Sequence, residues 1–171
     1  MSIGRKLAAE AKKKGICKAW HDELNCYGDN IDKMLEMYLK GIDFCLEKDY
    51  PDRYIITKYF KGKMEAFGVY LDDIIDVWDV PKVVALGATR GNVHATSYGV
   101  TEVFATHDAV LDILPKENSF VMVDVWGSAT VRVRAYHRAT VCVNIYSANA
   151  KVECHRNDDS LIKLRNKYDK I

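Results

Sequence analysis

The stretch from Asn118 to Leu164 decides the fold. It contains three similar phrases: Ser119-Phe120-Val121-Met122-Val123-Asp124-Val125-Trp126, Ala129-Thr130-Val131-Arg132-Val133-Arg134-Ala135-Tyr136 and Ala139-Thr140-Val141-Cys142-Val143-Asn144-Ile145-Tyr146. Valine alternates with other side chains in each phrase, as in a strand whose successive side chains point to opposite faces. A small residue opens each phrase and an aromatic residue closes it. The stretch therefore predicts repeated short strands joined by tight turns.

The same period of about ten residues reaches back to Pro81 and slips once, within Ser147-Ala148-Asn149. Alternation predicts that Val131, Val133 and Ala135 face inward while the side chains between them face outward. Small residues recur where the chain must turn, at Ala109, Ser119, Ala129, Ala139, Ala150 and Ser160.

Two architectures fit this pattern. An antiparallel β-sandwich would join its strands by hairpins, which favour Asn-Gly or Asp-Gly turns, and neither dipeptide follows Pro81. A β-solenoid would stack each strand on its equivalent in the next coil and would need a small residue at each corner. The sequence favours the β-solenoid, and the sandwich stays as the alternative.

The N-terminal part has helical rather than alternating periodicity. We expect helices over 2–14, 16–27, 30–48 and 52–60, with a further turn at 61–68. Asp72, Asp73, Asp76 and Asp79 follow, and they indicate a polar turn at the junction rather than a divalent-cation loop. The predicted class is α+β, with a helical module over 1–80 that packs on or caps a β-solenoid over 81–171, which ends in a short polar tail.

The repeated Ala-Thr-Val-x-Val-x-Ala-Tyr phrase resembles single-stranded, right-handed β-helix repeats of the bactofilin-like kind. The whole chain is similar to uncharacterised proteins of gut bacteria and their mobile elements, in which a helical part precedes such a tail. The resemblance covers roughly residues 81–164. It implies a stacked fold and self-assembly, and it carries over no catalytic residues.

Composition restricts the function further. The net charge is +1, so no overall field attracts nucleic acid or a membrane surface. The number of cysteines is five, and none forms a CxxC pair. With no apolar leader before Lys12 and no run of about 18 apolar residues, we expect a reduced, cytoplasmic protein without a membrane span or cofactor.

Charge is uneven along the predicted solenoid. Residues 101–130 hold one Lys or Arg against five acids, a net of −4, whereas 131–171 hold nine basic residues against four acids, a net of +5. Arg132 and Arg134 could bind phosphate or nucleic acid in this basic half. The simpler interpretation is that they pair with acidic side chains on neighbouring strands.

Catalytic and metal sites have weak support. Cys17, His21 and Cys26 lack the paired spacing of a structural zinc site. Glycan chemistry would require Asp112 and Asp124 to gather beside a basic residue. Turn side chains around His137 could stack in a ladder, and exposed turn histidines are favoured over a metal site shared by His107 and His137.

The function predicted from these patterns is non-catalytic binding of a protein partner, as in a mobile-element accessory or anti-defence protein. A self-assembling β-helical scaffold and a β-helix enzyme acting on a glycan are the alternatives. Aromatic and arginine side chains often anchor interfaces. The expected binding residues are Trp126, Arg132, Arg134, Tyr136, His137, Arg138 and Tyr146, with no catalytic or metal-binding residues.

Overall fold

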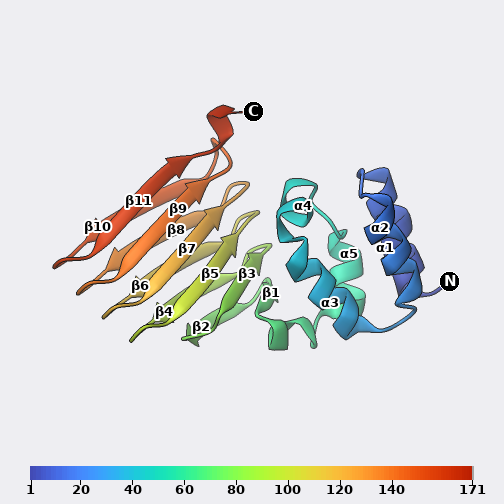
Figure 1. Cartoon of the computed structure of the whole chain (residues 1–171), viewed down its shortest axis with the longest axis horizontal. Helices are drawn as coiled ribbons and strands as arrows, with labels where there is room; N and C mark the ends of the chain where they lie inside the picture. The colour runs from blue at the N-terminus through green and yellow to red at the C-terminus, as the bar shows by residue number, and fades with distance from the viewer. Residues whose placement is uncertain (171) are drawn as a thin grey trace. The chain divides into compact units, whose positions relative to one another are not determined.

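The computed structural model describes residues 1–170. It divides into two compact units, a helical unit over Met1–Phe67 and a β unit that begins at Gly68 (Figure 1). The two units are described one at a time below.

The helical unit contains five α-helices followed by two short irregular helices. Two of the helices begin at polar caps, because the Ser2 and Asn30 side chains accept backbone N–H groups from Arg5 and Lys33. The elements are α1 (Ile3–Lys13), α2 (Lys18–Cys26), α3 (Ile31–Lys40), α4 (Ile42–Glu47), α5 (Arg53–Ile55), the π-helix η1 (Ile56–Phe60) and the 3-10 helix η2 (Met64–Phe67).

The single helix predicted over 30–48 is broken at Gly41, between α3 and α4. Glycine has the lowest helix propensity of any residue except proline, which favours a break at this position. The Trp20 ring also packs against it, since a β-carbon at Gly41 would lie 2.4 Å from a ring atom. Any larger residue at this position would displace Trp20.

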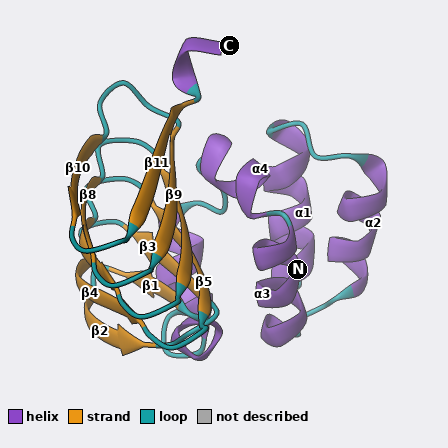
Figure 2. Ribbon diagram, turned by 60° about the vertical axis from the view of Figure 1, so that its left-hand side comes forward, coloured by secondary structure: helices purple, strands orange, loops and turns teal. Residues whose placement is uncertain are grey.

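The β unit is a β-solenoid with two strands in each coil (Figure 2). All neighbouring strands that pair in it are parallel, which excludes the antiparallel sandwich. Sheet A has the order β1-β3-β5-β7-β9-β11 and sheet B the order β10-β8-β6-β4-β2. The strands are β1 (Val69–Leu71), β2 (Ile74–Trp78), β3 (Lys82–Leu86), β4 (Arg90–Ala95), β5 (Val100–Ala105), β6 (Val110–Pro115), β7 (Phe120–Val125), β8 (Thr130–Ala135), β9 (Thr140–Ile145), β10 (Lys151–Arg156), β11 (Leu161–Asn166), and the 3-10 helix η3 (Tyr168–Lys170) follows.

The ten-residue period is half a coil. Val103 pairs with Val123 and Val123 with Val143, so equivalent positions in successive coils lie twenty residues apart. The slip near Asn149 lengthens the next step to twenty-one residues, since Val131 pairs with Val152. The solenoid also begins earlier than the predicted boundary at residue 81, because β1 and β2 already belong to its two sheets.

The interior of the solenoid is a column of valine and alanine side chains. Val131, Val133 and Ala135 face inward with no exposed surface, as predicted. The small residues Ala109, Ala129 and Ala139 are equally buried at the corners. Each strand buries only a few side chains and cannot form a core alone. The coils are therefore stabilised by stacking on one another.

Two rows of corners join the sheets. We call the corners after β1, β3, β5, β7 and β9 the first corner, and those after β2, β4, β6, β8 and β10 the second corner. Many of them place a non-glycine residue at positive φ, a conformation that L-residues rarely adopt. These residues are Asp72, Asp79, Ser97, His107, Glu117, His137 and Asp158.

Candidate binding surface of the solenoid

The seven predicted binding residues lie on three different surfaces. Arg132 and Arg134 are on β8, in sheet B. Trp126 and Tyr146 follow β7 and β9, at the first corner. The run from Tyr136 to Arg138 follows β8, at the second corner. The structure therefore does not bring them into one site.

The two arginines bind a carboxylate on the neighbouring strand. Arg132 donates from Nε to Oδ1 of Asp112 at 3.0 Å and from its guanidinium NH2 group to Oδ2 at 3.2 Å. Arg134 donates to the same Oδ1 at 3.2 Å. This arrangement confirms the simpler interpretation of the basic pattern, and it leaves less charge for a phosphate ligand. Because the arginine side chains stay 41% and 47% exposed, the pairing contributes little stability.

Sheet B carries a second polar cluster that the sequence pattern did not reveal. The ring of His94 stacks on Trp78 with centroids 3.8 Å apart and an interplanar angle of 4°. His94 Nε2 lies 2.9 Å from Asp76 Oδ1, and this hydrogen bond lowers the pKa of the Asp76 carboxyl. The contact depends on the register of β2 with β4, where Trp78 pairs with His94. The sequence alone does not show this contact, because the number of residues per coil must be known before Trp78 can be paired with His94.

The aromatic residues at the first corner pack on each other. Trp126 and Tyr146 are twenty residues apart, and their rings stack at 4.1 Å with an interplanar angle of 3°. Both side chains are partly buried. This stacking contact stabilises the packing of successive coils, and it leaves less ring surface for a ligand.

Turn side chains form a hydrogen-bonded ladder along the second corner, and His137 is its one histidine. His137 Nδ1 accepts the backbone N–H of Glu117 at 3.1 Å, and the N–H of His137 donates to Asp158 Oδ2 at 2.9 Å. Glu117 in turn accepts the N–H of Ser97. Each turn residue thus accepts an amide from the coil before it and gives its own amide to the coil after it, which offsets the cost of its positive φ.

Other corner side chains also accept backbone amides, His107 from the preceding coil and Asp72 and Asp79 from the following one. At the first corner His107 Nδ1 accepts the N–H of Gly87 at 3.0 Å, and Asp72 Oδ1 accepts that of Ala88 at 2.8 Å. Asp79 accepts both the N–H and the hydroxyl of Thr96. The aspartates therefore form polar turns, as the sequence indicated. A metal site shared by His107 and His137 is excluded, because the two histidines lie at different corners.

The remaining hypotheses about chemistry depend on groups that the fold separates. Asp112 points outward from sheet B, whereas Asp124 belongs to sheet A, where it is buried and accepts a 2.7 Å hydrogen bond from Asn144. They cannot act on one glycosidic bond. Within residues 1–170 the structure brings together no three His, Cys, Asp or Glu side chains that could hold a metal ion.

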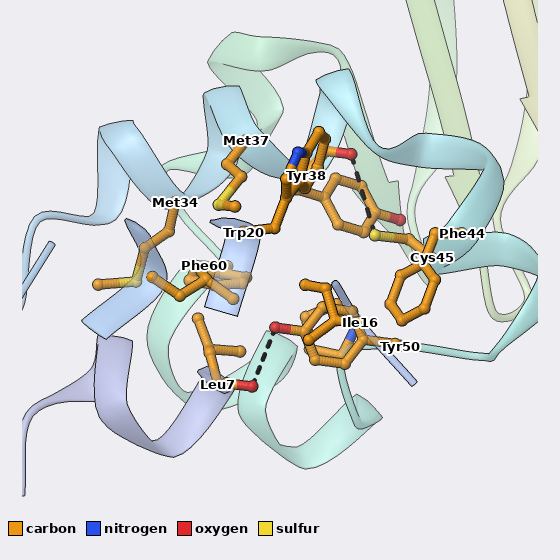
Figure 3. A pocket seen from close by; sticks show the side chains of 12 residues that line it. Leu7, Ile16, Trp20, Met34, Met37, Tyr38, Phe44, Cys45, Tyr50 and Phe60 are labelled. Carbon is orange, nitrogen blue, oxygen red and sulfur yellow. Dashed lines mark hydrogen bonds between the residues drawn. The ribbon is translucent and has the colours of Figure 1, made fainter. Parts of the chain in front are cut away.

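The helical unit contains a small apolar cavity (Figure 3). Its volume of about 20 Å³ is close to that of one water molecule. The polar groups on its walls are already bonded, since Tyr50 donates to the carbonyl of Leu7 at 3.2 Å and the Cys45 thiol to that of Tyr38 at 3.9 Å. Burial raises the pKa of the Cys45 thiol to about 12, so this thiol stays protonated. The cavity is a packing feature of the helical core.

The coil formed by β10 and β11 is the place where the solenoid exposes its interior. Ile162 and Leu164 pair with Val141 and Val143, so they occupy inward positions. Leu164 is nevertheless 55% exposed, whereas Val143 is fully buried. Leu161, on the outward side of β11, is 56% exposed. We call the free side of β11, with Leu161–Asn166, the β11 edge.

Comparisons with protein-family models, with curated proteins and with solved structures find no match to this chain. In the described part of the chain no helix has both the length and the apolar character needed to cross a membrane. Any functional conclusion must therefore come from the surfaces described above.

Proposed function

We propose that this chain is a non-catalytic binding protein that contacts another protein through the coil of β10 and β11. The observation that carries the proposal is the exposure of Leu164 on β11. The equivalent position is buried in β5, β7 and β9, which are earlier strands of sheet A. Val103, Val123 and Val143 occupy that position in the stack with no exposed surface. An apolar side chain in a core position gains stability when another chain covers it.

The fold supports binding rather than catalysis. Its sheets are arrays of short strands, and on sheet B Arg132 and Arg134 bond to Asp112 and His94 to Asp76. The aromatic residues at the first corner stack together, so they serve the stack itself. Among the predicted residues, Arg134, His137 and Arg138 stay exposed.

The test is affinity purification of the full chain from cells that express it, with the wild type compared with Leu164→Asp. We expect the wild type to retain a partner protein and Leu164→Asp to lose it, because a carboxylate would have to be desolvated in the contact. The matched control is Lys63→Asp, at an exposed site in the helical unit, which should retain the partner. Circular dichroism should show the same fold for all three. A partner retained equally by Leu164→Asp contradicts the proposal.

A further inference from the structure

The β11 edge has a chemistry that selects its partner. We propose that it binds an extended segment of another protein in which apolar and acidic side chains alternate, and that this segment adds a strand to sheet A. The inference rests on the proposed function and specifies the partner of the same coil.

The backbone of β11 is available for pairing. Leu161 and Lys167 donate their N–H groups to the carbonyls of Ala139 and Ile145, on the β9 side. Peptide groups of alternate residues point to opposite edges of a strand, so those of Ile162 and Leu164 point away from β9. Among residues 1–170, β11 pairs with β9 alone. Such an edge is a template for an added strand.

The inward side chains of the edge require apolar partners. Ile162 and Leu164 continue the interior column above Val141 and Val143. A strand laid on β11 would place every second side chain over these two residues. Apolar side chains there would complete the core in the way that each coil completes the one before it.

The outward side chains require acidic partners. Lys163 and Arg165 are exposed and stand beside the neutral side chains of Cys142 and Asn144 on β9. Within the part of the chain that the structure describes, neither has a carboxylate partner, in contrast to Arg132. Acidic residues at the outward positions of an added strand would lie directly beside these two cations, and such cross-strand pairs are favourable.

A second copy of this chain is a poorer occupant. An antiparallel β11–β11 pair would set two cations of one copy beside two of the other on the same face. If copies instead continued the stack, β10 on the next β2 would place Glu153 beside Asp76, the two ends of one outward row. Like charges opposite one another weaken pairing, and charged edge strands commonly prevent self-association.

The experiment measures the anisotropy of labelled peptides titrated with the full-length chain. We expect a peptide of alternating valine and glutamate to bind roughly tenfold more tightly than its valine–lysine counterpart. The double variant Lys163→Glu/Arg165→Glu should invert that preference. The control Lys40→Glu/Lys63→Glu changes net charge equally in the helical unit and should leave the preference unchanged.

Four further results would overturn the inference. Undiminished binding of a glutamate peptide methylated on its β11-facing amides would exclude strand addition. Tighter binding of a labelled oligothymidylate, lost on charge reversal, would make the edge a nucleic-acid site. A mass that rises with concentration in light scattering and falls with Leu164→Asp would assign the edge to a second copy. If charge reversal leaves the native partner bound while Leu164→Asp removes it, the proposed function stands and this inference fails.

Discussion

The inner coils of the solenoid and the coil of β10 and β11 share one pattern and differ in what covers them. Val133 and Val143 are fully buried, whereas the side chains that continue their rows, Cys154 and Leu164, keep exposed surface. The sequence alternates in the same way in both places. Burial in a solenoid therefore depends on neighbouring coils, and the same alternation gives a core in one place and a binding edge in another.

The largest expected effect compares one substitution at a closed and at an open position. Leu111→Ala removes a fully buried side chain and should lower the free energy of unfolding by about 2–5 kcal/mol. Leu164→Ala should lower it by less than about 1 kcal/mol, because the side chain is already more than half exposed. Urea unfolding followed by circular dichroism measures both. Equal losses would show that the β11 coil is covered in solution.

An intermediate effect is expected for the corner hydrogen bonds. Glu117→Gly keeps the positive φ of the turn but removes the acceptor of the Ser97 amide, which should reduce stability by about 0.5–1.5 kcal/mol. Asp158→Gly removes the acceptor of the His137 amide and should have a smaller effect, since the outermost coil opens locally at low free energy. Thermal unfolding of both variants tests the order, and a larger effect for Asp158→Gly would reverse the comparison.

The smallest effect concerns thiol reactivity, which reports coverage without changing stability. Cys17 and Cys26 are exposed and should react first with iodoacetamide at neutral pH. Cys154 should react more slowly because partial burial raises the pKa of its thiol, and Cys45, with a pKa raised to about 12, should react last. Mass spectrometry of digested samples gives the four rates. A Cys154 rate as slow as that of Cys45 would mean that the β11 coil is closed.

The solenoid, its inward residues and its small corner residues could be predicted from the sequence, because a period-two pattern and tight corners are local properties. The number of residues in a coil could not be predicted, since both halves of a coil have the same pattern. Without the coil length, the sequence could not show which of the candidate binding residues lie next to one another. Trp126 and Tyr136, ten residues apart, lie at different corners, whereas Trp126 and Tyr146, twenty apart, stack.

Two other differences have physical causes. The break at Gly41 follows from the low helix propensity of glycine, and the Trp20 ring packed on this glycine leaves no room for a larger residue. The early start of the solenoid depends on β1 and β2, which are only three and five residues long, so that their alternation is weak without the coils that pair with them. Leu164 showed the reverse problem: its inward position followed from alternation, but its exposure depends on what stacks above it.

The ladder at the second corner has a consequence for hydrogen exchange. Amides in turns usually exchange quickly, yet those of Ser97, Glu117 and His137 are each held by a side chain about twenty residues further along the chain. The exchange rate of each amide therefore reports whether the following coil is in place, and not whether its own coil is folded. The exchange rates of these three amide protons would therefore show the order in which successive coils unfold, from the β11 coil inward.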